Sequence, residues 1–358
     1  MAAIRIPWWA WLWPLLAWLV LAASLIVGTG GIVAAAAAIV LVATVFAAVY
    51  HAEVVAHRTG EPFGTLVLAV AVTVIEVALI VSVMVAAPGE KAGLARDTVF
   101  AAVMITCNGI VGMCLLWGGV RHHEQGFHLG GASAALAVLA ALTTLSLVLP
   151  NVATSVPGPR FSTSQLVFEG VISLVLYVSF VFIQTVRHRD YFLPDGGDAE
   201  AHAPPPSNAN AVASAVLLLA ALVAVVGLAK ALTPTLEVGI AHLELPKAVV
   251  GIAIAALVLL PEGMAAVRAA RANRLQTSLN LALGSALASI GLTIPAVVVV
   301  SIIIDKPVEL GLNAKDQLLL ALTLFLNVIT LGTGRTTVLQ GIIHLVIFAV
   351  FVFFAMVP

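Results

Sequence analysis

Two glutamates stand deep inside long apolar segments, where an ionisable side chain is expected to do chemistry. Glu76 lies about twelve residues, or about 18 Å of helix, from either end of the apolar segment 64–87. Glu262 is the only charged residue between Ala248 and Val267. A carboxylate at such depth in a bilayer costs at least about 2.5–3.5 kcal/mol and normally marks a path for an ion or a proton. For either glutamate alone, a protonated or paired carboxyl that only holds helices together is the alternative.

Neutral oxygen atoms are available close to both carboxylates in the sequence. Thr73 lies one turn before Glu76 on the same helix face. Pro261, directly before Glu262, removes a helical hydrogen bond and so frees backbone carbonyl oxygens. Taken singly, small polar residues in membrane helices more often serve helix packing than ion binding. The next apolar segments add the candidate ligands Thr106, Asn108, Asn280, Ser285 and Ser289.

Two carboxylates among neutral oxygens suit a hard cation such as Ca²⁺, which takes six to eight oxygen ligands. The same carboxyl groups also bind protons, so a cation and a proton compete for one site. If the protein rearranges only when Glu76 and Glu262 are both neutralised, it exchanges one ion for the other. The pattern therefore predicts a secondary antiporter with alternating access. A passive cation channel or uncoupled carrier that uses the same acidic pair is the alternative.

The composition places these residues in a membrane protein. Apolar residues make up 62% of the 358 residues and charged residues only 9%, whereas an ordinary soluble domain has about 25% charged residues. The net charge of −1 offers no basic surface for nucleic acid. We therefore expect membrane lipid, inorganic cations and protons as partners, no nucleic acid, and no cofactor beside the transported ions.

No arrangement typical of an enzyme is visible in the sequence. His51, Glu53 and His57 differ in spacing from the His-Glu-x-x-His of zinc proteases, which sets two ligands one helical turn apart. An intramembrane hydrolase would need a base beside the serines of segment 277–304, and the sequence assigns none. His344 is interpreted as a packed or hydrogen-bonded histidine. We predict no enzymatic activity.

Apolar segments of about 20 residues each provide one membrane crossing. They predict an all-α polytopic membrane protein with about eleven transmembrane helices, the first of which is rich in tryptophan, a residue that gathers at the membrane interface. The predicted spans are roughly 8–27, 31–50, 64–87, 98–119, 130–149, 166–186, 211–232, 246–267, 277–304, 316–332 and 336–357.

A Pro- and Gly-rich segment, 188–210, divides the chain and is predicted to be an exposed linker. Before it come the Trp-rich helix (1–30) and a five-helix half (31–187), and after it a second five-helix half (211–358). Halves with an odd number of helices insert in opposite orientations, which predicts two inverted five-helix repeats. With the N-terminus in the cytoplasm and the C-terminus outside, the larger share of the basic residues faces the cytoplasm, as the positive-inside rule requires.

Three further features are open to two interpretations each. Glu53 is a candidate for the proton entrance. His122 and His123 are either part of a solvated turn or a pH sensor, because histidine titrates near neutrality. The linker is either a plain connection or a region that attracts cations through Asp195, Asp198, Glu200 and His202.

Several stretches of the sequence resemble bacterial ChaA-type cation/proton antiporters of the calcium:cation antiporter superfamily. The resemblance covers nearly the whole chain from the second span onward, and the two glutamate stretches are its most specific part. The stretches are Val74–Ile80, Leu94–Phe100, Pro261–Val267, Asn280–Ser289 and Leu331–Thr337.

This resemblance implies an eleven-helix antiporter in the bacterial inner membrane, with two inverted repeats that contribute Glu76 and Glu262. It implies export of Ca²⁺, or in this subgroup of Na⁺ or K⁺, against inward protons. Calcium/proton exchangers often carry Gly-Asn just before the glutamate. Here Val72-Thr73 and Val258-Leu259 occupy that region, so a drier site is expected and the preference among the three cations stays open.

Overall fold

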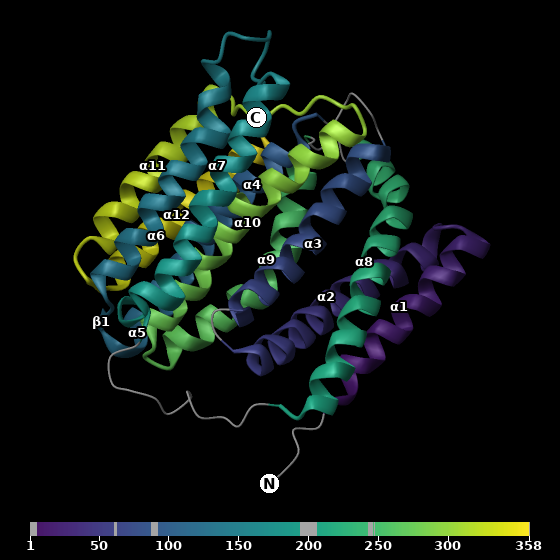
Figure 1. Ribbon diagram of the computed structural model, residues 1–358, viewed down its shortest axis with the longest axis horizontal. Coiled ribbons are helices and arrows are strands. Elements are labelled where there is room, and N and C mark those ends of the chain that lie inside the picture. Colours follow the sequence, from purple (N-terminus) through teal and green to yellow (C-terminus); the bar gives the residue numbers. More distant parts are fainter. Residues whose placement is uncertain are drawn as a thin grey trace. The chain divides into compact units, whose positions relative to one another are not determined.

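The structure is a computed structural model that describes residues 6–60, 63–86, 92–193, 206–242, 246 and 248–357 (Figure 1). The middle of the predicted linker, with Asp195, Asp198, Glu200 and His202, lies outside the described residues. The described ends of the linker are a short 3-10 turn, η5 (Arg189–Phe192), and the residues that lead into the next helix.

Helices account for nearly all of the described residues, as the uniformly apolar segments predict. The first half of the chain contains α1 (Trp8–Val27), α2 (Gly31–Thr59), α3 (Phe63–Ala86), α4 (Leu94–Met104), α5 (Val111–His122), α6 (Leu129–Thr143) and α7 (Thr163–Phe182). The second half contains α8 (Asn208–His242), α9 (Ala248–Arg271), α10 (Leu275–Ile303), α11 (Ala314–Leu331) and α12 (Val338–Met356).

Three π-helical turns and a 3-10 turn extend these helices without breaking their path. The turn η1 (Ile105–Ile110) joins α4 to α5, so that Leu94–His122 forms one span. The turns η2 (Thr144–Val148) and η3 (Leu149–Asn151) prolong α6, and η4 (Ile183–Arg187) prolongs α7.

The described residues contain ten helices that are long and apolar enough to cross a membrane, and α3 contains a shorter apolar segment, Val67–Ser82. Together they correspond one to one with the eleven predicted spans. The prediction of an all-α polytopic membrane protein is confirmed.

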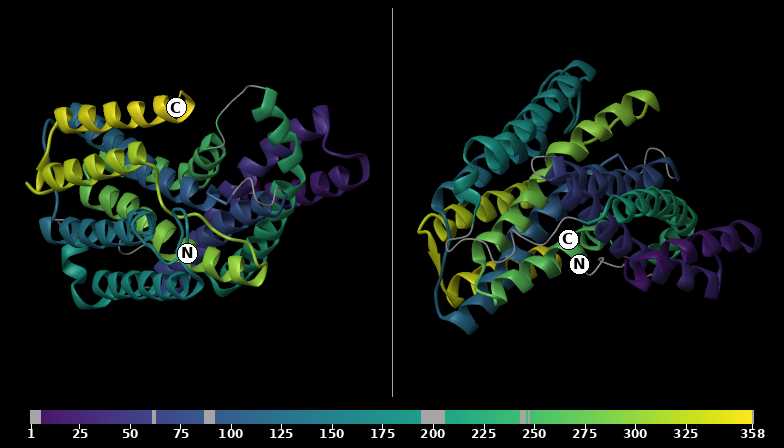
Figure 2. Two further views of the ribbon diagram at one scale, coloured as in Figure 1. Left: turned by 90° about the horizontal axis from the view of Figure 1, so that it is seen from above. Right: turned by 60° about the horizontal axis from the view of Figure 1, so that its bottom comes forward.

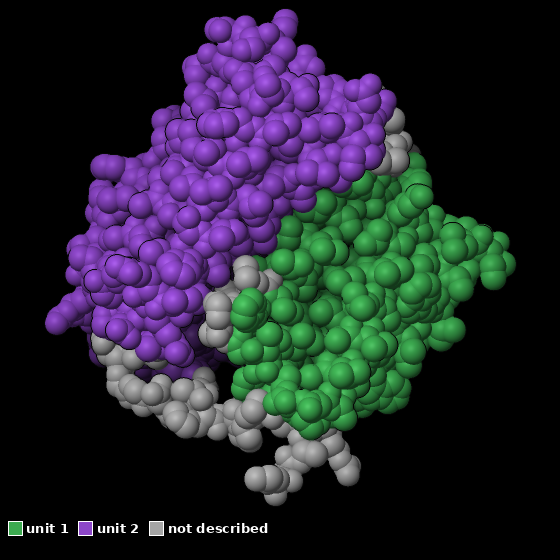
Figure 3. All heavy atoms as spheres, in the orientation of Figure 1, with its two compact units in different colours: residues 1–91, 198–245 green, residues 92–197, 246–358 purple. Residues whose placement is uncertain are grey.

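The chain forms two compact units, shown in separate colours in Figure 3. The first unit, residues 1–91 and 198–245, contains α1, α2, α3 and α8. Its central helix α2 contacts the other three and buries mostly alanine and valine along its length. Small side chains let membrane helices approach closely, because packing rather than hydrophobic burial joins helices in lipid.

The second unit, residues 92–197 and 246–358, contains α4 to α7 and α9 to α12. Within it α10 packs on α7 and α9, α12 packs on α5, and α9 packs on α4. Figure 2 shows the yellow α11 and α12 beside each other, and these two helices are in contact.

Backbone hydrogen bonds hold loops together at both ends of the second unit. At one end β1 (Gln125–Gly126) pairs antiparallel with β2 (Arg335–Thr336), just before α6 and α12 begin. At the other end, where α7 begins, the backbone N–H of Gly311 donates to the Pro159 carbonyl at 3.0 Å. Because α6 runs from the first end to the second, α7 and α12 begin at opposite ends of this unit.

The compact units do not coincide with the two predicted halves. The first unit combines α2 and α3 from before the linker with α8 from after it. The units group helices by contact, whereas inverted repeats are a relation of topology, so the predicted division into domains stays a prediction.

Candidate functional site

Glu262 lies in the middle of α9, fourteen residues after its first residue, Ala248. The helix continues through Pro261, which leaves a backbone carbonyl one turn earlier without its usual N–H partner. The Ser285 hydroxyl of α10 donates a hydrogen bond to Oε2 of Glu262. Ser289, one turn further along α10, is 2% exposed. The predicted residues Glu262, Ser285 and Ser289 therefore lie on helices that pack against each other.

Glu76 belongs to the first unit and occupies a matching position in its helix, thirteen residues after Phe63, the first residue of α3. Its side chain is 1% exposed. Thr73, one turn earlier, is 8% exposed, and its hydroxyl has no hydrogen-bond partner among the described residues. A buried carboxyl with a hydroxyl one turn away is the arrangement that the sequence predicts for this half.

Asn108 lies in the π-turn η1 and uses both ends of its amide. Its Nδ2 donates to Thr323 Oγ1 at 2.9 Å, and its Oδ1 lies 3.1 Å from Nδ1 of His344. His344 Nε2 lies 3.0 Å from Thr330 Oγ1. Since Oδ1 of Asn108 can only accept, Nδ1 of His344 carries the hydrogen. The interpretation of His344 as a hydrogen-bonded histidine is confirmed. In this structure the Asn108 amide is engaged by Thr323 and His344.

Thr106, in the same π-turn, differs from Asn108 in its hydrogen bonding. Its side chain is fully buried, and its hydroxyl has no hydrogen-bond partner among the described residues. Interior polar atoms are nearly always paired, and π-turns within helices are frequent at functional sites. Thr106 therefore remains a candidate ligand.

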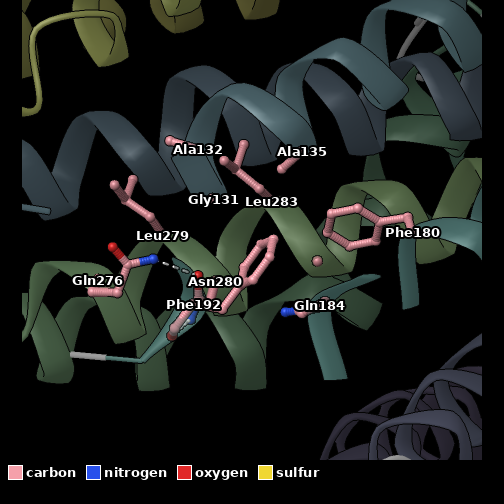
Figure 4. Close-up of a pocket in the computed structure, with 11 residues that line it drawn as sticks. Gly131, Ala132, Ala135, Phe180, Gln184, Phe192, Gln276, Leu279, Asn280 and Leu283 are labelled. Carbon is pink, nitrogen blue, oxygen red and sulfur yellow. Dashed lines mark hydrogen bonds between the residues drawn. The ribbon is translucent and has the colours of Figure 1, made fainter. Parts of the chain in front are cut away.

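Asn280 lies in a different polar cluster (Figure 4). Its Oδ1 accepts from Gln276 at 2.9 Å, and its Nδ2 donates to the Phe192 carbonyl of η5 at 2.6 Å. The cluster borders a cavity of about 10 Å³ lined by α6, α7, η4, η5 and α10, which is enough for about one water molecule. Asn280 therefore links α10 to η5 by a hydrogen bond. It lies five residues before Ser285, whose hydroxyl contacts Glu262.

The structure also describes the two smaller candidate sites, which contain Glu53 and His122. Glu53 is exposed on α2, in the first unit. His122, at the end of α5, lies with Nε2 3.0 Å from the carbonyl oxygen of Arg271, the last residue of α9. The turn that holds His122 therefore contacts the end of the helix that carries Glu262.

Side chains typical of resident metal sites do not cluster in the described parts of the chain. His, Cys, Asp and Glu form no group of three among these residues that could hold a metal ion.

A further buried carboxyl, Glu169, is one that the sequence analysis does not single out. Glu169 lies in α7 and is 5% exposed. The apolar segment begins at about residue 166, which puts Glu169 at a helix end, but α7 begins at Thr163 after a capping box formed by Ser162 and Gln165. The Ser-x-x-Gln pattern is the sequence signal that would have placed the helix start correctly.

Comparisons with known proteins agree with this architecture. The family model described as sodium/calcium exchanger protein matches residues 20–186 and 213–357. The chain is 50% identical to the protein y4hA of Sinorhizobium fredii, over 99% of this chain and 97% of that protein. It is 35% identical to the sodium-potassium/proton antiporter ChaA of Escherichia coli, over 87% of this chain and 85% of that protein.

Solved structures show the same fold. Native YfkE matches with a TM-score of 0.76 at 15% identity, over 98% of this chain and 100% of that one. The H⁺/Ca²⁺ exchanger CAX matches with a TM-score of 0.71 at 15% identity, over 94% of this chain and 85% of that one. With the family model matching most of its length, the chain belongs to the sodium/calcium exchanger family of the calcium:cation antiporter superfamily.

Proposed function

We propose that this protein is a secondary antiporter that exchanges Ca²⁺, or Na⁺ or K⁺, for protons by alternating access at Glu76 and Glu262. The observation that carries the proposal is the contact between Glu262 and Ser285 inside the membrane helices of the second unit, with Glu76 buried at a matching position of α3. Family membership supports cation exchange. The 35% identical ChaA, named as a sodium-potassium/proton antiporter, supports coupling to protons.

The chemistry follows from the two states of a carboxyl group. Ionised Glu262 attracts a cation, to which Ser285, Ser289 and the carbonyl freed by Pro261 supply neutral oxygens. Protonated Glu262 carries no charge and keeps an oxygen that accepts from Ser285. A cation and a proton thus neutralise the same group in turn, and only a neutralised group crosses the low-dielectric interior at moderate cost.

The experiment that tests this proposal uses inside-out membrane vesicles that hold a pH gradient. Addition of Ca²⁺, Na⁺ or K⁺ is expected to dissipate the gradient in vesicles with the protein and not in vesicles without it. The most effective ion identifies the transported cation. If none of the three moves protons while a labelled cation still crosses the membrane, the protein is an uncoupled carrier or channel.

We propose further that Glu53 lies at the proton entrance, because it is an exposed carboxyl on a membrane helix of the first unit. Replacement of Glu53 by Gln removes the group that collects protons. The pH dependence of exchange is then expected to shift, while the cation affinity at high pH, where protons do not compete, stays the same. The measurement is the exchange rate as a function of pH. An unchanged pH dependence removes Glu53 from the proton path.

We also propose that the N-terminus is cytoplasmic and the C-terminus outside, in a bacterial inner membrane. This orientation places the turn with His123 inside and the loop with Lys306 outside. A His123→Cys variant is expected to resist an impermeant maleimide added to intact cells, whereas Lys306→Cys is expected to react. The native Cys107 and Cys114 are buried and serve as the unreactive background. The reverse pattern of labelling contradicts the orientation.

A further inference from the structure

Glu169 is a membrane carboxyl that the proposed transport cycle does not use. It is the seventh residue of α7, about 9 Å from the start of that helix. It belongs to the second unit, and its side chain is 95% buried, since 5% is exposed. Ionisable side chains at such a depth are rare and usually functional.

Two serine hydroxyls converge on one oxygen of this carboxyl. Ser173, one turn further along α7, donates to Oε1 at 2.7 Å, and Ser146 of η2 donates to the same atom. The other oxygen, Oε2, is buried and has no hydrogen-bond partner among the described residues. An ionised carboxylate would leave charge on Oε2 without a donor, which is costly in an apolar setting. A protonated carboxyl places its hydrogen there and leaves Oε1 as the acceptor of both hydroxyls.

Among the described elements that pack on α7, only η4 carries a basic residue. The elements that pack most extensively on α7 are α10, α6, η2 and η4. The first three contain no charged residue, and η4 carries Arg187, eighteen residues further along the chain. On α7 itself the other titratable side chain is Tyr177, two turns away. These surroundings therefore favour protonated Glu169 over the ionised carboxylate.

A cavity adjoins Glu169. It has a volume of about 310 Å³ and is lined by Glu169 and Gln165 among apolar side chains that include Leu145, Phe161 and Phe168. Such a volume has room for several water molecules. Water in the cavity can supply the donor that Oε2 needs when the carboxyl loses its proton.

The second half of the chain offers an internal comparison. His344 is likewise the seventh residue of its helix, α12, which also begins after a capping box, formed by Thr337 and Gln340. Both ring nitrogens of His344 lie within hydrogen-bond distance of a side-chain oxygen. His344 is therefore already satisfied as a neutral side chain, whereas Glu169 keeps one oxygen without a partner beside a cavity.

We propose that Glu169 is a proton-binding site separate from Glu76 and Glu262, with Ser146 and Ser173 as its fixed hydrogen-bond donors and the adjoining cavity as its route to water. In its loaded form the site holds one proton on Oε2. In its empty form it is a carboxylate that draws water into the cavity.

Hydrophobic carbodiimides test this proposal, because they label carboxyl groups that are protonated in apolar surroundings. The purified full-length protein is treated with dicyclohexylcarbodiimide between about pH 5 and about pH 9, and the labelled residues are identified by mass spectrometry. Label on Glu169 is expected at low pH and is expected to decline as the pH rises. The exposed Glu124 is the matched carboxyl that should not retain label.

Two variants sharpen the result. Glu169→Gln is expected to lose the label at this position. The double variant S146A/S173A removes the donors that stabilise the carboxylate, so its labelling is expected to persist to higher pH. If Glu169 stays unlabelled at every pH, or is labelled equally at every pH, the proton site is overturned.

A role of the Glu169 proton in transport requires that the protein is the proposed antiporter. Glu169→Gln is expected to make the pH dependence of exchange shallower while cations still drive proton movement. An unchanged pH dependence contradicts a transport role for Glu169. The labelling experiment needs no gradient and no cation, so its failure and the failure of the antiport are distinguishable.

Discussion

Replacement of Glu262 by Gln is expected to lower cation-driven proton movement at least about 100-fold, which corresponds to about 2.7 kcal/mol. The amide has nearly the same shape and still offers an oxygen to the Ser285 hydroxyl that Glu262 accepts in the native protein. It carries no negative charge for a cation and takes up no proton at neutral pH. The loss would therefore come from the chemistry of the carboxyl group rather than from its size.

The matched variant is Ser285→Ala, which keeps the carboxylate and removes one hydroxyl. The expected loss is at least about tenfold, since one hydrogen bond to a charged group contributes roughly 1.5–3 kcal/mol. Both variants are measured in proteoliposomes at equal protein content, after size-exclusion chromatography shows that they fold. Glu76→Gln is expected to behave like Glu262→Gln. Full exchange in both glutamate variants shows that the proposed site is wrong.

Replacement of Gly341 by Ala is expected to lower the free energy of unfolding by about 1–3 kcal/mol. A Cβ atom at this position would lie 2.4 Å from the backbone nitrogen of Leu116 and 2.9 Å from the carbonyl oxygen of Gly112. These are backbone atoms of α5, so they cannot move aside as the end of a side chain can. The helices α5 and α12 must therefore separate, and α12 carries His344 and its contact with Asn108.

Gly284→Ala is the matched control for this prediction. A Cβ atom at Gly284 meets nothing within 4 Å, and alanine favours a helix by about 1 kcal/mol over glycine. The thermal midpoint of unfolding in detergent is expected to fall by several degrees for Gly341→Ala and to hold or rise for Gly284→Ala. Equal midpoints in the two variants contradict the close approach of α5 and α12.

The helices could be predicted from the sequence because lipid imposes a simple rule, about 20 apolar residues for each crossing. The contact between Glu262 and Ser285 could also be predicted, since consecutive helices joined by a short turn pack against each other. In α7 the same rule predicts the start of the helix about three residues too late. Hydropathy marks where a helix becomes apolar rather than where it begins, so Glu169 was assigned to a helix end, although the capping box at Ser162 starts the helix earlier.

Other features of the site depend on contacts between distant parts of the chain. Asn108 and His344 are 236 residues apart, and nothing in the spacing of either indicates the other. Asn280 matches a ligand by residue type, but its amide is bonded to η5, a short turn that follows the apolar segment of α7 and has no apolar period of its own. Residue type and depth identify candidate ligands, and only tertiary contacts show which polar atoms are already bonded.

The central claim is that one cation moves in exchange for protons. Its most direct test records cation and proton fluxes together in proteoliposomes whose membrane potential is clamped at zero, with wild type and Glu262→Gln compared. The account predicts that each cation taken up releases protons in a fixed ratio, and that both fluxes disappear together in the variant. Cation uptake that continues without proton release in the wild-type protein would contradict it.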